Sequence, residues 1–369
     1  MRPAFSSTRQ AAAFALLLLG LLLAPALASK RILPPRETIY SSIWWGSGDF
    51  PYMDGQIFGD TNAMDIAFLG SSHIWAAFDT PSVQEQLGKQ LGRPATVRTF
   101  GWGGAGYDEL YFVAEDLLAH HKVRMLVFDD EYDASDQPHI LASKMFRYGD
   151  DAYVLDGLPM SLKASYYFAS IAGIPRNVLS MSRPNLPADM NATNYWESRS
   201  HAQNFAAMLG MFTAHIGFKD NPGVEPGPFV TYAPATDVQP SDVCVYSPDT
   251  KTNFVFSSHD LPPGQFFFEY MLNILADQCG CKLVILHVPM YDERRSPVIS
   301  MPKYWPDNLW TNVPRLGIPP ATLFRGLSDT DIRKLYSDHV HLNENGQEYF
   351  TRLMTPALLK IYESQIQSP

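Results

Sequence analysis

The chain has 369 residues, of which 46% are hydrophobic, 13% aromatic and 18% charged. This composition excludes a disordered protein, a coiled coil and a collagen-like fibre, and it suffices for a large hydrophobic core. The formal net charge is −10, from 28 basic and 38 acidic residues. An excess of negative charge repels phosphate, so we expect no nucleic acid partner.

The first 28 residues predict an export signal. Arg2 and Arg9 precede an apolar run from Ala11 to Leu23, and small residues up to Ala28 end the segment in the pattern that a signal peptidase requires. The run is short for a membrane helix, which needs about 20 residues. We therefore expect a periplasmic or extracellular protein that is cleaved after Ala28, with an uncleaved N-terminal tether as the alternative.

Apolar runs bounded by turn residues predict buried strands, and apolar positions at helical spacing predict helices between them. This alternation of strands and helices favours an α/β protein with a parallel sheet covered on both faces. The expected strands are residues 63–69, 95–100, 123–128 and 282–288, and the expected helices are 82–91, 107–121, 266–277 and 346–365.

The middle of the chain breaks this alternation. Residues 147–258 are rich in Pro, Asn, Ser and aromatic side chains without a clean period, so we expect an inserted cap or lobe. Helical pieces are expected within it at 160–171 and 202–216. The predicted organisation is a signal peptide at 1–28, an α/β domain made of 29–146 and 259–369, and the insertion at 147–258.

The three cysteines are too few to be the main stabilising element of an exported protein of this length. Cys244 could pair with Cys279 or with Cys281, or all three thiols remain reduced. A Cys-Gly-Cys pair without further cysteines or clustered histidines is a poor zinc site. We expect neither a metal nor another cofactor.

Two glycine-containing segments follow the first two expected strands, where open α/β sheets place their ligands. Ser71 and Ser72 stand at a tight strand-to-helix turn, which can expose a nucleophilic hydroxyl, although serines at such positions also cap helices. Phe100–Gly106 holds four glycines and can aim backbone amides at a bound group. An ordinary glycine-rich turn is the alternative, and no phosphate-binding pattern follows.

A third segment precedes the last expected helix. Asp338 stands three positions before His341, a spacing that can set the carboxylate against one imidazole nitrogen while the other faces a nucleophile. Asp338, His339 and His341 could instead hold a metal, and a surface histidine is the default for such a segment alone. His259 and Asp260 are the only other residues that could complete a metal-dependent phosphoesterase.

Together the three segments resemble the sequence blocks of the SGNH (GDSL-type) hydrolase superfamily. The Gly-Ser-Ser form, the export signal and the insertion look most like its envelope branch, which includes proteins of alginate O-acetylation and teichoic-acid D-alanylation. The resemblance covers roughly residues 60–135 and 262–365. It implies a flavodoxin-like three-layer fold of α/β class with a parallel sheet.

The resemblance also implies roles for individual residues. Ser72 would be the nucleophile, His341 its general base and later acid, and Asp338 the group that orients His341. The Ser72 amide and Gly104 would form the oxyanion hole. The family usually carries an asparagine after the third strand, whereas this chain has Asp129, so a third oxyanion donor is unassigned.

Five acidic residues gather after the third expected strand. They could hold a cation or contact substrate hydroxyls, but a solvated loop is the simpler interpretation. Arg294 or Arg295, after the fourth strand, could bind a carboxylate of an acidic glycan, and ordinary ion pairing is the alternative. The acidic residues are Asp129, Asp130, Glu131, Asp133 and Asp136.

The function implied by this resemblance is that of an exported serine esterase or O-acyltransferase that moves a small acyl group, acetyl in our expectation. The partner would be a cell-envelope or extracellular glycan or another small acylated substrate, with envelope-glycan modification machinery as a further partner. The oligomeric state stays open. The alternative is a glycan-binding or assembly protein of weak catalytic power on the same fold.

Overall fold

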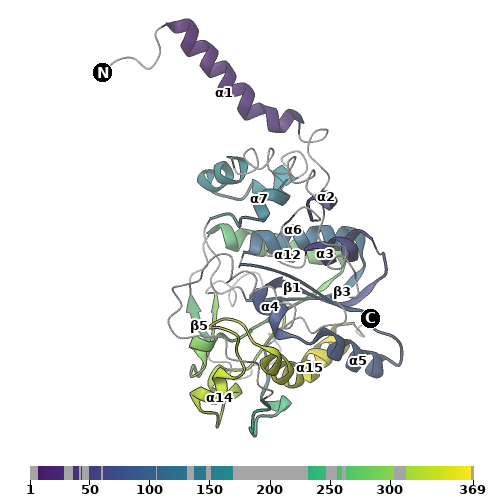
Figure 1. The fold of residues 1–369 in the computed structure, drawn as a ribbon. Helices are drawn as coiled ribbons and strands as arrows, with labels where there is room; N and C mark the ends of the chain where they lie inside the picture. The colour runs from purple at the N-terminus through teal and green to yellow at the C-terminus, as the bar shows by residue number, and fades with distance from the viewer. Residues whose placement is uncertain are drawn as a thin grey trace.

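The structure is a computed structural model, and a central six-stranded sheet forms the middle of its fold (Figure 1). The structure describes residues 7–28, 36–40, 43, 50–59, 61–104, 106–130, 137–146, 151–168, 232–246, 256–259, 263–302 and 313–366. The sheet order is β2-β1-β3-β6-β8-β4. The strands are β1 (Met64–Ser71), β2 (Val97–Trp102), β3 (Val123–Asp129), β4 (Cys244–Tyr246), β6 (Lys282–Leu286) and β8 (Arg315–Gly317), and a separate two-stranded sheet pairs β5 (Phe256–His259) with β7 (Ile299–Pro302).

The five strands from β2 to β8 run parallel, and β4 pairs antiparallel with β8 at the edge. Counted along the chain, the parallel strands have the spatial order 2-1-3-4-5 of a doubly wound sheet. The predicted α/β class with a parallel sheet is therefore confirmed. In such sheets ligands bind where the strand order reverses, at the carboxyl end of β1, between β2 and β3.

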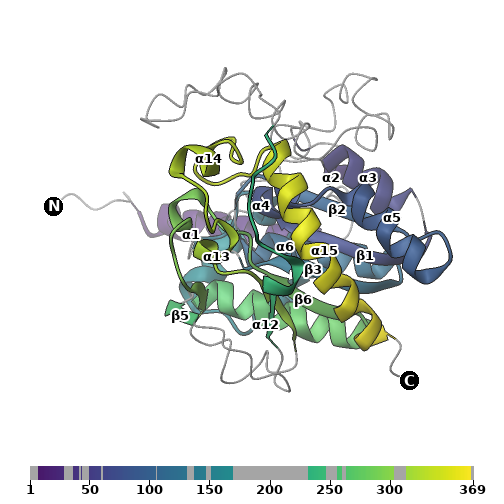
Figure 2. The same cartoon turned by 90° about the horizontal axis from the view of Figure 1, so that it is seen from below.

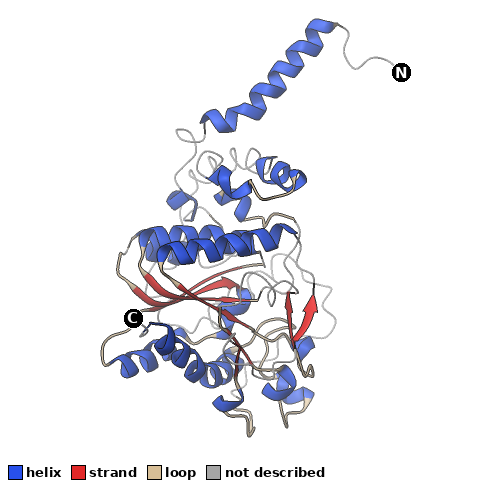
Figure 3. Ribbon diagram, turned by 180° about the vertical axis from the view of Figure 1, so that it is seen from behind, coloured by secondary structure: helices blue, strands red, loops and turns tan. Residues whose placement is uncertain are grey.

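Helices cover both faces of the sheet, so that the molecule has three layers (Figure 3). One face carries α2, α3, α6 and α12, and the other carries α4, α5 and α15. Figure 2 shows α15 lying across the second face. The helices are α1 (Thr8–Ala28), α2 (Arg36–Tyr40), α3 (Phe50–Phe58), α4 (Ser72–Ala77), α5 (Thr80–Leu91), α6 (Tyr107–His120), α7 (Ala142–Met145), α12 (Pro263–Cys279), α13 (Pro320–Leu323), α14 (Asp329–Arg333) and α15 (Glu344–Ile366).

The two cores follow from the alternation of side chains along each strand. In β1, Ile66 and Phe68 join the core under α5 and α15, whereas Ala67 and Leu69 join the core under α6 and α12. Successive side chains of a strand point to opposite faces, so a strand buried on both sides is apolar at most positions. This explains the continuous apolar runs in the sequence.

The predicted strands and helices lie within a few residues of those in the structure. The sequence interpretation missed β4, β5, β7 and β8. Residues 147–150, 169–231 and 247–255 of the expected insertion, including the helix expected at 202–216, lie outside the described residues. Of the rest, residues 160–168 are helical as expected, and β4 joins the edge of the main sheet.

The N-terminal helix α1 projects away from the three layers (Figure 1). Its apolar side chains are exposed, among them Leu16, Leu17 and Leu21. Within the described part of the chain, no helix has both the length and the apolarity that a membrane span requires. Export and cleavage after Ala28 stay predictions.

The three cysteines are all free thiols in this structure. The sequence left open a disulfide or three reduced thiols, and the structure has the three reduced thiols. Cys281 is buried next to β6, and burial raises the pKa of its thiol to about 12. A thiol with such a pKa stays protonated and is a poor nucleophile at neutral pH.

Candidate active site

Ser72 stands at the turn where β1 ends and α4 begins, at the carboxyl edge of the sheet. The preceding Ser71 caps α4, because its hydroxyl accepts a hydrogen bond from the His73 amide at 3.3 Å. The capping role that the sequence allowed for both serines therefore falls to Ser71. The Ser72 hydroxyl instead faces His341, with 2.7 Å between Oγ and Nε2.

His341 is held in turn by Asp338. Its Nδ1 lies 2.7 Å from Asp338 Oδ2, and Asp338 Oδ1 accepts the backbone amides of Val340 and His341 at 2.7 and 2.8 Å. A carboxylate accepts only, so Nδ1 carries the proton and Nε2 accepts from Ser72. Burial pushes the pKa of Asp338 upward, but the hydrogen bond and charge of His341 and the two amides outweigh it and bring the pKa to about 2.

The loop around Asp338 is fixed by backbone hydrogen bonds just before α15 begins. The Ser337 amide donates to the His341 carbonyl at 2.8 Å, and Tyr336 forms an isolated bridge with Leu342. The structure thus brings together three predicted site residues, although Ser72 and His341 are 269 positions apart. A hydroxyl, an imidazole and a carboxylate in series are the arrangement that activates a serine nucleophile.

A second histidine packs against this series. The ring of His73 lies 5.7 Å from that of His341 in an edge-to-face arrangement. Burial and the charge of His341 lower the pKa of His73 to about 3, against the opposing effect of Asp338. His73 is therefore neutral at physiological pH, and its uncharged ring flanks the base.

The glycine-rich segment lies beside Ser72 because β2 pairs with β1 in parallel. Ser71 stands opposite Trp102, so Gly103 and Gly104 follow at the same edge of the sheet. Gly104 has φ +90°, which disfavours any other residue. That the Ser72 and Gly104 amides form an oxyanion hole stays a prediction.

The acidic residues at the end of β3 are not the solvated loop that we expected, as far as the structure describes them. Asp129 and Asp130 are 1% and 7% exposed. Asp129 accepts the Ser71 hydroxyl at 2.7 Å, and burial, assisted by the charge of Asp130 and opposed by Ser71, raises the pKa of Asp129 to about 7. Residues 131–136, with the other three acids, lie outside the described residues.

The side chain of Asp130 contacts another buried histidine, His287, which follows β6. The distance from Asp130 Oδ2 to His287 Nδ1 is 2.7 Å, and Glu293 Oε2 lies 3.8 Å from Nε2. Burial pushes the pKa of His287 down, but the charge and hydrogen bond of Asp130 and the charge of Glu293 raise it to about 9. His287 is thus a charged imidazolium at neutral pH, and its charge also contributes to the low pKa of His73.

The structure does not bring His339 into the series with Asp338 and His341. His339 Nδ1 lies 3.5 Å from Asp292 instead, and the His339 ring contacts Tyr291. The described residues contain no group of three or more His, Cys, Asp or Glu side chains placed to hold a metal ion. The side chains of His259 and Asp260 lie outside the described residues.

Arg294 and Arg295 both pair with Asp329, with closest distances of 3.3 and 2.7 Å. Of the two alternatives for these arginines, the structure has the ordinary ion pair.

The sequence interpretation missed three histidines near this edge: His73, His139 and His287. His73 directly follows Ser72, and His287 follows a predicted strand, so their positions in the chain were a usable signal. His139 carries no such signal, because it follows neither a strand nor a glycine-rich turn.

Searches of the sequence against protein-family models and against curated proteins give no significant match.

Proposed function

We propose that the chain is an exported serine esterase or O-acyltransferase of the SGNH type. The observation that carries this proposal is the series from Ser72 through His341 to Asp338, with both distances at 2.7 Å. The resemblance of the three sequence blocks supports the same assignment, and the parallel three-layer α/β architecture is compatible with it.

In the first half-reaction, the Ser72 oxygen attacks the acyl carbon of an ester and its proton passes to Nε2 of His341. The tetrahedral intermediate collapses, the ester C–O bond breaks, and the leaving alcohol takes that proton. Asp338 stays ionised and stabilises the imidazolium that forms in between, which agrees with its low pKa.

In the second half-reaction, water or a glycan hydroxyl gives its proton to His341 and attacks the acyl-enzyme. The Ser72 oxygen leaves and recovers the proton. Water yields hydrolysis, and a glycan hydroxyl yields acyl transfer. We propose acetyl as the acyl group and an envelope or extracellular glycan as the substrate, on the resemblance to the envelope branch.

The test is release of p-nitrophenol from p-nitrophenyl acetate by the protein without residues 1–28. We expect Ser72→Ala and His341→Ala to lose activity by about 10⁴-fold or more, because the members of such a series act as a unit. Ser71→Ala is the matched control, because it changes the adjacent serine and should retain far more activity. Equal rates in Ser72→Ala and the unmodified protein would overturn the proposal.

A second candidate function is a glycan-binding or assembly protein of weak catalytic power. The observation that favours it is Asp129, a carboxyl bonded to Ser71 where the resembled family has an asparagine that donates to the oxyanion. Binding of an acetylated glycan with no ester cleavage in any variant would favour this second function.

A further inference from the structure

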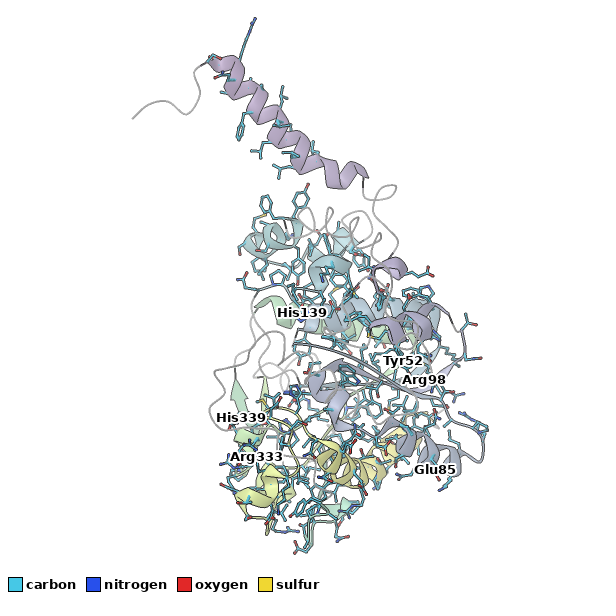
Figure 4. All side chains as sticks on the ribbon, viewed as in Figure 1. Tyr52, Glu85, Arg98, His139, Arg333 and His339 are labelled. Atoms are coloured by element: carbon cyan, nitrogen blue, oxygen red, sulfur yellow. The ribbon has the colours of Figure 1, made fainter. Side chains whose placement is uncertain are left out.

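We infer that His139 is a positioning residue of the oxyanion hole, acting through the peptide that joins Gly103 and Gly104. This inference rests on the proposed function, which it deepens. His139 Nε2 lies 3.2 Å from the carbonyl oxygen of Gly103. Figure 4 shows His139 on the side of the sheet that α6 and α12 cover.

The carbonyl of Gly103 and the amide of Gly104 belong to one peptide unit. No peptide bond among the described residues is cis, so within this planar group the C=O and N–H point in opposite directions. A hydrogen bond to the Gly103 oxygen therefore fixes the direction of the Gly104 N–H and polarises it. In the described part of the chain, that N–H donates to no residue, so it is available to a ligand.

The tautomer of His139 is set by its other nitrogen. Nδ1 accepts the Leu141 amide at 3.3 Å, while the nearest oxygen of Glu109 is too far for a hydrogen bond, at 4.0 Å. Nε2 therefore carries the proton and donates to Gly103. Burial also lowers the pKa of His139, against the charge of Asp108, so the ring is a neutral single donor at pH 7.

The backbone of His139 is held by Asp108, and the glycines of the segment leave room for its side chain. Its backbone amide donates to Asp108 Oδ2 at 2.7 Å, and the same oxygen accepts the Tyr166 hydroxyl. A Cβ on Gly104 would stand 2.8 Å from His139 Nε2, and a Cβ on Gly106 would stand 3.0 Å from His139 Cβ. The turn after β2 thus packs closely against the imidazole of His139, and only glycine at positions 104 and 106 leaves room for this side chain.

The experiment compares His139→Gln with His139→Met in the full chain. Both side chains are unbranched and of similar length, but only glutamine keeps a donor at the position of Nε2. For p-nitrophenyl acetate we expect kcat of His139→Met to fall about 10- to 100-fold with little change in KM, since loss of one oxyanion donor costs about 10²–10³-fold and this loss is indirect. His139→Gln should recover most of the rate.

Inhibition by a trifluoromethyl ketone distinguishes this positioning role from a purely structural one. Its tetrahedral adduct with a serine carries an oxyanion, so its Ki should rise in His139→Met by about the factor by which kcat falls. Unchanged kcat and Ki, or a fall in kcat without a matching rise in Ki, would overturn the inference. If His139→Met does not fold, His139→Phe, a flat ring without the donor, takes its place in both measurements.

Ser72→Ala is assayed beside these variants. If Ser72→Ala keeps full activity, the proposed function fails and the inference about His139 fails with it. If Ser72→Ala is inactive while His139→Met matches the unmodified protein, the inference about His139 alone is wrong.

Discussion

At the scale of single residues, the buried carboxyl of Asp129 leads us to predict how the stability of the protein changes with pH. Its folded pKa of about 7 lies above the ordinary 3.8, so the folded protein holds this proton longer than the unfolded chain. The unmodified protein therefore loses stability as pH rises between these values. Asp129→Asn keeps an acceptor for Ser71 and cannot ionise, so its stability relative to the unmodified protein should be greater at pH 8 than at pH 5.

Urea unfolding at the two pH values measures this difference. A relative stability of Asp129→Asn that is equal at pH 5 and pH 8, or smaller at pH 8, would contradict the buried protonated carboxyl.

The pair of His287 and Asp130 predicts a loss of stability in the same direction, with rising pH, but over a higher pH range. The folded pKa of His287 is about 9 against the ordinary 6.5. The stabilisation is therefore fully present below about pH 6.5 and is lost as pH rises through 9, and a shift of this size is worth about 3 kcal/mol. His287→Gln should flatten the decline of the unfolding free energy between pH 6.5 and 10. A decline as steep as in the unmodified protein would show that another group titrates there.

The residues of the site differ in how far the sequence could predict them. Ser72, Asp338 and His341 each stand at a strand end or before a helix, where local patterns are informative. His139 and His287 were missed because their partners come from tertiary packing. Asp108 is 31 residues from His139, and Asp130 is 157 residues from His287.

At the scale of elements, α4 packs so closely on β2 that we expect no side chain larger than that of glycine to fit at Gly101. A Cβ there would stand 2.5 Å from the Cβ of Trp75, whose side chain is fully buried in α4. We expect Gly101→Ala to cost about 1–3 kcal/mol of stability and to lower the proposed esterase activity, because α4 carries Ser72 and must shift.

Gly55→Ala is the matched control for this substitution, measured by the same denaturant unfolding. Gly55 lies in α3 and its Cβ would meet nothing within 4 Å, so alanine there should stabilise the helix by about 1 kcal/mol. Equal effects of the two substitutions would contradict the close contact of α4 with β2.

Elements with strong local patterns were predicted, and those defined by a distant partner were not. β1, β3 and β6 are apolar over most of their length because they face two cores. β4 and β8 have only three residues each, and their pairing joins segments about 70 positions apart. No local periodicity can reveal such strands.

At the scale of the whole molecule, Arg36 ties the N-terminal segment to the body. Its guanidinium lies 2.7 Å from Glu115, 3.4 Å from Asp116 and 2.9 Å from Asp151, and its side chain is only 14% exposed. One cation thus connects α2, α6 and the start of the segment 151–168. Removing it leaves three carboxylates close together and largely buried.

We expect Arg36→Met to lower the unfolding free energy by about 3–5 kcal/mol at pH 7.5. The loss should be smaller at pH 5, because carboxylates without their cation take up protons. Burial, opposed mainly by Arg36, already raises the pKa of Asp116 to about 6. Urea unfolding at both pH values tests this, and a loss that is equal at the two would contradict the electrostatic origin.

The measurement that tests the central claim most directly is covalent labelling of the protein by a fluorophosphonate, followed by peptide mapping. We predict one probe per chain on Ser72, no labelling of Ser72→Ala, slow labelling of His341→Ala, and labelling of Ser72 retained in Ser71→Ala. Labelling at another serine, or equally fast labelling of His341→Ala and the unmodified protein, would contradict a nucleophile activated by His341 and Asp338.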